Sequence, residues 1–152
     1  MHNIRNAIFL SILIYPSWAQ AEASYDPARD GKQELISALA RATQEAKPVL
    51  VIVGGDWCSS CVALDHAMLA DAAMQRLLSE RLILLKINYS AKNKNAAAMK
   101  MLPFFLGYPS AFMLDANGHI IKTKSIFHFE SNGKFDLAGY RLALLRVLDR
   151  AQ

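Results

Sequence analysis

Two cysteines, Cys58 and Cys61, are the residues of this chain whose type and spacing most directly indicate chemistry. The apolar run Val49–Val53 precedes them and predicts a buried strand, and an amphipathic stretch follows them and predicts a helix. Cys58 would then lie at the start of that helix, where free backbone N–H groups and the helix dipole favour a thiolate and lower the thiol pKa. Two thiols one helical turn apart can close into a disulfide and open again. The pattern therefore predicts thiol–disulfide exchange.

The elements before and after the cysteine pair alternate in type. A turn at Tyr25–Pro27 precedes about twenty residues of helical pattern, whose predicted apolar face holds Leu35, Ile36, Leu39 and Ala46. Pro48 ends this helix, because proline disfavours helical geometry in the residue before it. The helix after the motif carries an apolar stripe of Cys61, Leu64 and Met68. Asp71 is predicted to cap a further helix, with Met74, Leu77 and Leu78 on its apolar face.

The second half of the chain completes a sheet. We expect, in order, a strand over Leu82–Asn88, a short helix over Asn95–Met101 ended by Pro103, a hairpin of Ala111–Leu114 and His119–Thr123 around the turn Asp115–Gly118, and a final helix capped by Asp136. Helices and strands in this order favour an α/β fold, with a mixed sheet covered by helices on both faces.

The first 21 residues have the pattern of a secretory signal peptide. Arg5 is their only charged residue, residues 7–15 are nearly all apolar, and small residues follow. We expect cleavage after Ala19 or Ala21 and a single mature domain over residues 22–152. An uncleaved membrane anchor is the alternative, but the apolar run is shorter than the roughly 20 residues that a spanning helix needs.

Export and charge limit the classes of function. In the cytosol a CxxC pair can be half of a zinc site, whereas in an oxidising compartment it is a disulfide or a redox centre. The net charge is +4, and removal of the leader takes away one arginine and no acid, which leaves about +3. Few aromatic residues accompany the scattered lysines, so nucleic-acid binding is not expected. We expect a periplasmic or secreted monomer.

The motifs taken together resemble the thioredoxin superfamily, and in particular exported thioredoxin-like proteins with a Tyr-Asp-Pro turn and Gly-Gly-Asp-Trp-Cys. Four landmarks in order carry the resemblance over nearly all of the mature chain: Trp57–Cys61 after a strand, the strand Leu84–Asn88, Gly107–Ser110 before a strand, and the turn Leu114–Gly118. The resemblance implies a thioredoxin-like fold with a central mixed sheet of about four strands.

The resemblance also implies roles for individual residues. Cys58 corresponds to the attacking cysteine and Cys61 to the resolving one. Pro109 corresponds to a cis-proline beside the disulfide, where the backbone at Tyr108 pairs with a bound substrate strand; a trans-proline turn is the alternative. Trp57 corresponds to the aromatic residue that shields the motif, and ordinary core packing is its alternative.

Two departures from the family pattern bear on mechanism. Thioredoxins carry a buried aspartate six residues before the first cysteine, which assists proton transfer at the resolving thiol, and here that position is Ile52. Lys86 matches the lysine that usually partners this acid, and Asp56 is the nearest carboxylate in the sequence. The residues between the cysteines, Ser59 and Ser60, match neither the reductase Gly-Pro nor the oxidase Pro-His, and their hydroxyl groups could donate hydrogen bonds to a thiolate.

No metal site or cofactor other than the cysteine pair is predicted. His66 follows Cys58 by two helical turns, and we interpret it as a solvent-facing residue rather than a metal ligand. The methionines Met99, Met101 and Met113 could contact copper, but we interpret them as core residues.

Three functions are compatible with these residues. The leading hypothesis is an exported thiol–disulfide oxidoreductase that acts on protein thiols or disulfides, in a reductase-like role supported by a membrane electron donor. The alternative is a non-catalytic peptide-binding module in which Cys58 and Cys61 form a permanent disulfide. A copper chaperone that uses both thiolates is the third.

Overall fold

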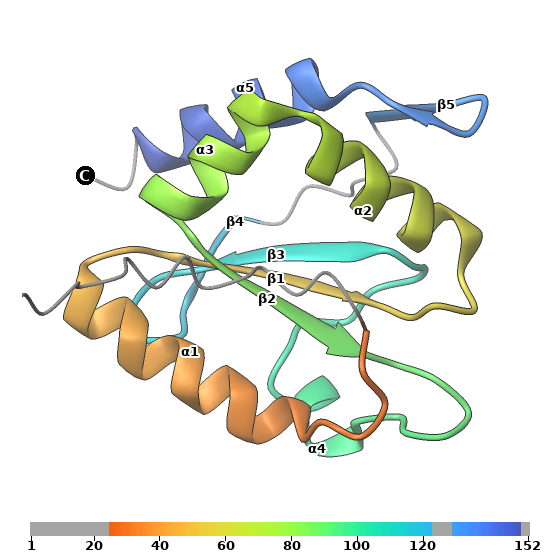
Figure 1. The fold of residues 1–152 in the computed structure, drawn as a ribbon. Helices are drawn as coiled ribbons and strands as arrows, with labels where there is room; N and C mark the ends of the chain where they lie inside the picture. Colours follow the sequence, from red (N-terminus) through yellow and green to blue (C-terminus); the bar gives the residue numbers. More distant parts are fainter. Residues whose placement is uncertain (1–24, 123–128, 150–152) are drawn as a thin grey trace, which may run out of the picture.

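A computed structural model of the chain describes residues 25–122 and 129–149, and places a mixed sheet between two layers of helices (Figure 1). The helices are α1 (Gly31–Glu45), α2 (Ser59–Ala70), α3 (Ala72–Arg81), α4 (Ala96–Met99) and α5 (Leu137–Leu148). The strands are β1 (Val49–Gly54), β2 (Ile83–Asn88), β3 (Ser110–Leu114), β4 (Ile120–Lys122), β5 (Glu130–Ser131) and β6 (Lys134–Phe135). The predicted leader, residues 1–21, lies outside the described residues. Within the described ranges, no helix has the length and apolar character needed to cross a membrane.

The main sheet has the strand order β2-β1-β3-β4 and confirms the expected mixed architecture. β1 pairs with β2 in parallel and with β3 in antiparallel orientation, and β3 pairs antiparallel with β4. All six residues of β1 are buried, as expected for a central strand covered on both faces. Its carboxyl end leads directly to the cysteine motif, so the most buried strand positions the site.

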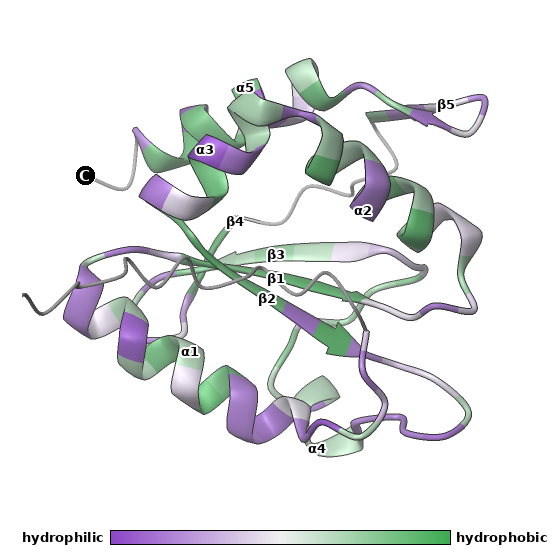
Figure 2. Ribbon diagram, in the orientation of Figure 1, coloured by the Kyte–Doolittle hydropathy of each residue, from purple (hydrophilic) through white to green (hydrophobic). Residues whose placement is uncertain are grey.

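Helices cover both faces of this sheet, with α1 and α4 on one side and α2, α3 and α5 on the other (Figure 1). Successive side chains of β1 point to opposite faces, because the side-chain period of a strand is two residues. Leu50 and Ile52 therefore belong to the core under α2, α3 and α5, whereas Val49, Val51 and Val53 belong to the core under α1 and α4. Figure 2 accordingly shows β1 green along most of its length, and β2 green apart from purple segments.

The buried face of α1 differs from the one that the sequence predicted. Leu35, Ala38 and Ala42 are buried, but Ile36 is 44% exposed and Ala46 is also exposed. Residues three and four apart share a helix face, so Ile36, one residue after Leu35, points well away from the core. Ala46 lies beyond the last turn, in the left-handed conformation that ends the helix (φ 51°).

The predicted helix caps are confirmed, and one small element was not predicted. The side chain of Asp71 accepts a hydrogen bond from Met74 N at 2.8 Å, and that of Asp136 accepts one from Gly139 N at 2.9 Å. The strands β5 and β6 form a short antiparallel hairpin just before α5. Two residues per strand are too few for an alternating pattern to be visible in a sequence.

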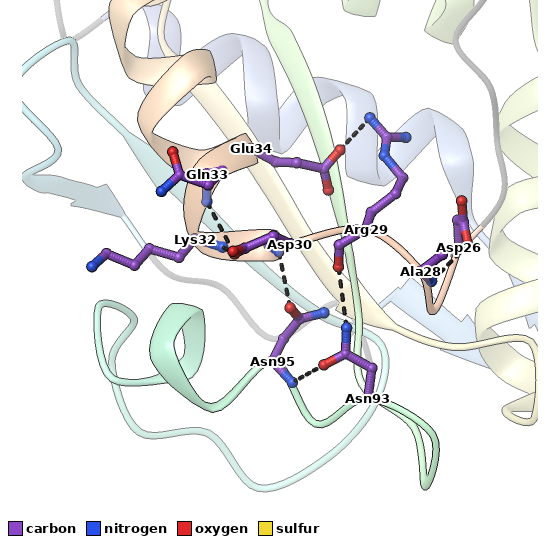
Figure 3. Close-up of polar contacts among 10 residues, drawn as sticks. Asp26, Ala28, Arg29, Asp30, Lys32, Gln33, Glu34, Asn93 and Asn95 are labelled. Atoms are coloured by element: carbon purple, nitrogen blue, oxygen red, sulfur yellow. Dashed lines mark hydrogen bonds and ion pairs between the residues drawn. The ribbon is translucent and has the colours of Figure 1, made fainter.

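Asparagine side chains tie the turn before α1 to the loop after β2 (Figure 3). Asn93 Nδ2 donates to the carbonyl oxygen of Arg29 at 3.1 Å. The buried Asn95 accepts from Gly31 N at 2.9 Å through Oδ1 and donates from Nδ2 to Asn88 O at 2.7 Å. These bonds satisfy the backbone at the start of α1 and hold the N-terminal turn against the carboxyl end of β2.

Candidate active site

Cys58 and Cys61 form a disulfide at the N-terminus of α2, as the sequence pattern suggested. Cys58 is the N-cap residue, and its Sγ accepts a hydrogen bond from Cys61 N at 3.2 Å. Cys58 retains 8% of its surface exposed, whereas Cys61 is completely buried. An external sulfur would therefore meet Cys58 first, and Cys61 would be reached only through it.

A glycine at the end of β1 lets the Cys61 sulfur approach the sheet. A Cβ atom added at Gly54 would lie 2.7 Å from Cys61 Sγ, closer than real Cβ contacts come. The position therefore requires the absence of a side chain. This requirement explains why the strand ends in glycine immediately before the loop that carries the cysteines.

Trp57 lies on the surface beside the disulfide, so it is not an ordinary core residue. Its side chain is 59% exposed, and its Nε1 donates to the carbonyl oxygen of Tyr89 at 2.6 Å. Its ring meets Tyr108 edge to face, with 5.5 Å between ring centroids. The hydrogen bond fixes the indole while most of its surface stays open to solvent, an arrangement suited to contact with another molecule.

Tyr108 and Pro109 lie opposite the disulfide. The Tyr108–Pro109 peptide bond is cis, and Cys58 Sγ lies 3.6 Å from the carbonyl oxygen of Tyr108. The Tyr108 ring stacks on Tyr89 at 5.0 Å and meets Phe105 edge to face at 5.5 Å. Burial, together with the neighbouring Tyr89, raises the pKa of Tyr108 to about 12, so its hydroxyl is neutral at physiological pH. The structure thus brings the three predicted substrate-contact residues together around Cys58, with Trp57 exposed, Tyr108 half-buried and Pro109 buried.

Lys86 forms a buried ion pair with a residue that the sequence analysis did not single out. Its Nζ lies 2.6 Å from Oδ1 of Asp65 on α2, and both side chains are less than a tenth exposed. Ile52 is next to Lys86 in the register of β1 and β2. The strand position that holds an acid in thioredoxins is therefore apolar here, and the carboxylate that faces the lysine comes from the helix instead.

Asp65 follows Cys61 by four residues, so the two side chains lie one turn apart on the buried face of α2. Burial raises the pKa of Asp65, and the adjacent Lys86 partly opposes this. Burial lowers the pKa of Lys86, opposed in turn by Asp65. A carboxylate with a raised pKa is suited to accept a proton from a thiol. The sequence signal that could have revealed the role of Asp65 was an acidic residue on the same helix face as the apolar stripe of Cys61, Leu64 and Met68.

The other predicted supporting residues lie farther from this arrangement. Asp56 is exposed, and Asp65 rather than Asp56 is the ion-pair partner of Lys86. Ser59 is exposed and Ser60 is half-buried. Neither serine hydroxyl makes a hydrogen bond to another group in the part of the chain that the structure describes.

The described residues offer no cluster typical of a metal site. Among them, no group of three or more histidine, cysteine, aspartate or glutamate residues converges. His66 is exposed, as expected. Met113 is buried in the core and Met99 is half-buried, but Met101 is largely exposed, so the expectation that all three are core residues is wrong for Met101.

Comparison with known proteins agrees with this geometry. The sequence profile of the family described as Thioredoxin-like matches residues 30–116. The thiol:disulfide interchange protein DsbD of Citrobacter koseri is 31% identical over 86 residues, which are 55% of this chain and 15% of that protein. DsbD of Yersinia enterocolitica is 29% identical over 102 residues, 67% of this chain and 17% of that protein. The chain thus spans only a small part of the length of these relatives.

Solved structures share the fold at lower identity. A disulphide isomerase from Xylella fastidiosa superposes with a TM-score of 0.57 at 24% identity, covering 63% of this chain and 74% of that one. A structure described as DsbH oxidoreductase also has a TM-score of 0.57, at 23% identity, covering 75% of this chain and 81% of that one. With the family profile extending from the cap of α1 to the turn after β3, this chain belongs to the thioredoxin-like family.

Proposed function

We propose that this protein is a thiol–disulfide oxidoreductase that exchanges disulfides with other proteins through Cys58 and Cys61. The observation that carries the proposal is the placement of Cys58 as N-cap of α2, with 8% of the residue exposed where Cys61 is fully buried, and with its Sγ 3.6 Å from the Tyr108 carbonyl oxygen. The first backbone N–H groups of the helix stabilise a thiolate at this point. The interchange activity named for its relatives supports the same reaction class.

The reaction proceeds in two exchange steps. In the first, the Cys58 thiolate attacks one sulfur of a substrate disulfide, which forms a mixed disulfide and releases one substrate thiolate. In the second, Cys61 attacks the Cys58 sulfur, its thiol proton passes to Asp65, and the Cys58–Cys61 bond forms as the second substrate thiolate leaves. The substrate gains two electrons and the cysteine pair loses two.

Asp65 supplies the proton acceptor that Ile52 cannot supply. It lies on the same helix face as Cys61, and its pKa is raised by burial. Lys86 keeps the carboxylate from being a lone buried charge, which would be strongly unfavourable. Because the sulfur that must lose a proton is completely buried, a nearby internal acceptor is more effective than bulk water.

Trp57 and Tyr108, beside the buried Pro109, form the surface that would receive the substrate. The exposed indole of Trp57 precedes Cys58 in the chain, and Tyr108, whose ring stacks on Tyr89, lies beside the Cys58 sulfur. An extended polypeptide laid beside Pro109 would place its cysteine against Cys58. Aromatic rings provide contact area at a low cost in conformational entropy, which suits a surface that must accept many sequences.

A reductase-like direction in the periplasm, with electrons drawn from a membrane donor, is the finer part of the proposal. It is supported by the leader pattern in residues 1–21 and by Trp57 and Lys86, which resemble those of reductive members. The reduction potential distinguishes the directions. A value near about −270 mV would identify a reductant, and one near about −120 mV an oxidant.

Insulin reduction tests the activity itself. With dithiothreitol as the electron source, the wild-type protein is expected to turn over, whereas Cys58→Ser is expected to be inactive. Cys61→Ala should retain Cys58 and accumulate mixed disulfides with its substrates in cells, which would identify them. An inactive wild-type protein whose disulfide resists reduction would instead support the peptide-binding module.

A further inference from the structure

Tyr25, which opens the described chain, places a buried hydroxyl group beside the resolving cysteine. The residue is 1% exposed and belongs to the same core cluster as Cys58 and Cys61. The point at which a Gly54 Cβ would lie is 3.0 Å from Tyr25 Oη and 2.7 Å from Cys61 Sγ. The hydroxyl and the resolving sulfur therefore face the same small space above the end of β1.

This hydroxyl makes no hydrogen bond in the disulfide form. Among the described residues, Tyr25 Oη has no partner although it is fully buried. Most buried polar groups in proteins are hydrogen-bonded, and those that are not commonly have a functional reason. A phenol can donate one hydrogen bond, so an acceptor that appears only after reduction would satisfy it.

The charged surroundings of Tyr25 indicate what that acceptor is. Lys86 Nζ lies 5.6 Å from the centre of the Tyr25 ring, and the carboxylates of Asp65 and then Asp56 are the charges that act most strongly on the phenol. Burial and these carboxylates raise the pKa of Tyr25, so the hydroxyl keeps its proton and has a hydrogen bond to donate. Cys61 is the group in this space that gains negative charge during the reaction.

Building on the proposed function, we propose that Tyr25 is a positioning residue that donates a hydrogen bond to the Cys61 sulfur once the disulfide opens. The donation stabilises the reduced pair and the Cys61 thiolate that resolves the mixed disulfide. No bond to Tyr25 forms or breaks: the Cys61 proton passes to Asp65, and the phenol keeps its own. The N-terminal turn thus takes part in the redox site.

Tyr25→Phe tests the proposal, because it removes one oxygen atom and keeps the ring. Redox equilibrium with dithiothreitol should show the reduced form about tenfold less favoured than in the wild type, which corresponds to a potential about 30 mV more negative for a two-electron couple. In a Cys58→Ser background, Tyr25→Phe should raise the Cys61 pKa, measured from the pH dependence of thiol alkylation. Tyr140→Phe is the matched control, because Tyr140 also has a buried hydroxyl without a partner among the described residues. It is expected to change neither value.

Urea unfolding of both redox forms separates this role from simple packing. The oxidised Tyr25→Phe protein should be at least as stable as the wild type, because the oxygen that it lacks was unpaired, whereas the reduced protein should be less stable. The proposal would be overturned if Tyr25→Phe changed the free energy of unfolding equally in the oxidised and reduced forms. It would also be overturned if the variant left the reduction potential and the Cys61 pKa unchanged. Wild-type protein that shows these Tyr25 effects but reduces no protein disulfide would refute the proposed function alone.

Discussion

Asp65 and Lys86 meet across the interface between α2 and the sheet, with 2.6 Å between Oδ1 and Nζ. One residue comes from the helix that carries both cysteines, and the other comes from the strand beside β1. Lys86 is the register partner of Ile52, the position where the family pattern places an acid. A buried carboxylate one helical turn from Cys61 is therefore supplied by α2 rather than by the strand.

Asp65→Asn should slow the resolving step. General-base assistance contributes roughly a hundredfold or more, so a loss of this order is expected near neutral pH. The wild-type rate should fall as the pH drops through the raised pKa of Asp65, because the protonated acid cannot accept the thiol proton. The variant should lose this dependence and recover only at high pH, where Cys61 ionises without help. Single-turnover kinetics across pH measure both effects, and the exposed Asp56→Asn serves as the control.

Lys86→Met should destabilise the fold. It leaves Asp65 buried without its ion-pair partner, and removal of one member of a buried pair costs about 3–5 kcal/mol. The double variant Asp65→Leu, Lys86→Met should recover most of this free energy of unfolding, since no buried charge remains. Urea denaturation measures both. A single variant as stable as the wild type would mean that the pair is not buried in solution.

Trp57→Ala should weaken substrate binding more than it weakens the fold. The indole is mostly exposed, and its loss removes aromatic contact area beside Cys58. We expect the KM for a protein disulfide to rise about tenfold with a smaller change in kcat, and the melting temperature to move little. The KM of Trp57→Phe should lie between those of the wild type and Trp57→Ala, because phenylalanine keeps a ring but loses the hydrogen bond to Tyr89. A large fall in melting temperature would contradict a surface role.

Asn95→Ala should destabilise the protein by about 2–4 kcal/mol. Two buried backbone groups, Gly31 N and Asn88 O, would lose their partner, and alanine is strained at the left-handed φ of 44°. Asn95→Gly removes the strain but not the lost hydrogen bonds, so its cost should be smaller. The difference between the free energies of unfolding of the two variants, measured in urea, gives the cost of placing alanine in the left-handed conformation. Equal stability of both variants and the wild type would exclude the role assigned to Asn95.

Asp71 should contribute stability that depends on pH. Its hydrogen bond to the backbone of Met74 and the nearby Arg141 lower its pKa, so folding favours the ionised carboxylate. This stability is present above the pKa of an unfolded aspartate and is lost as the pH falls through the lowered value. In thermal unfolding, Asp71→Ala should be less stable than the wild type at pH 7. The difference between their melting temperatures should become smaller in strong acid. A difference in melting temperature that did not change with pH would exclude a contribution of the ionised Asp71 carboxylate to stability.

The sequence predicted the fold well where local chemistry was strong. The uninterrupted apolar run of β1, the proline after α1 and the aspartate caps at Asp71 and Asp136 each impose a local structure that tertiary contacts did not override. The same holds for Cys58, whose position at the start of α2 follows from the strand-to-helix switch. The same features predict the disulfide from the sequence.

Features that depend on long-range contacts were not predictable in this way. Asp65 pairs with a lysine 21 residues away, and only the packing of α2 on β2 brings them together. Tyr25 looks like part of a turn in the sequence, yet the fold buries its ring beneath the disulfide. Ile36 lies on the solvent side because the orientation of α1 is set by the sheet, not by its own composition.

Tyr25 follows the predicted processing point after Ala21 by only four residues, and Asn93 and Asn95 anchor the turn that comes next. Cleavage at that predicted point would leave the new N-terminus only a few residues from the proposed redox site. A protease that cleaved after Tyr25 would remove the buried ring next to Cys61. An affinity tag fused directly to Tyr25 would disturb the packing of that ring. Recombinant versions of the protein should therefore keep a short natural spacer ahead of this tyrosine.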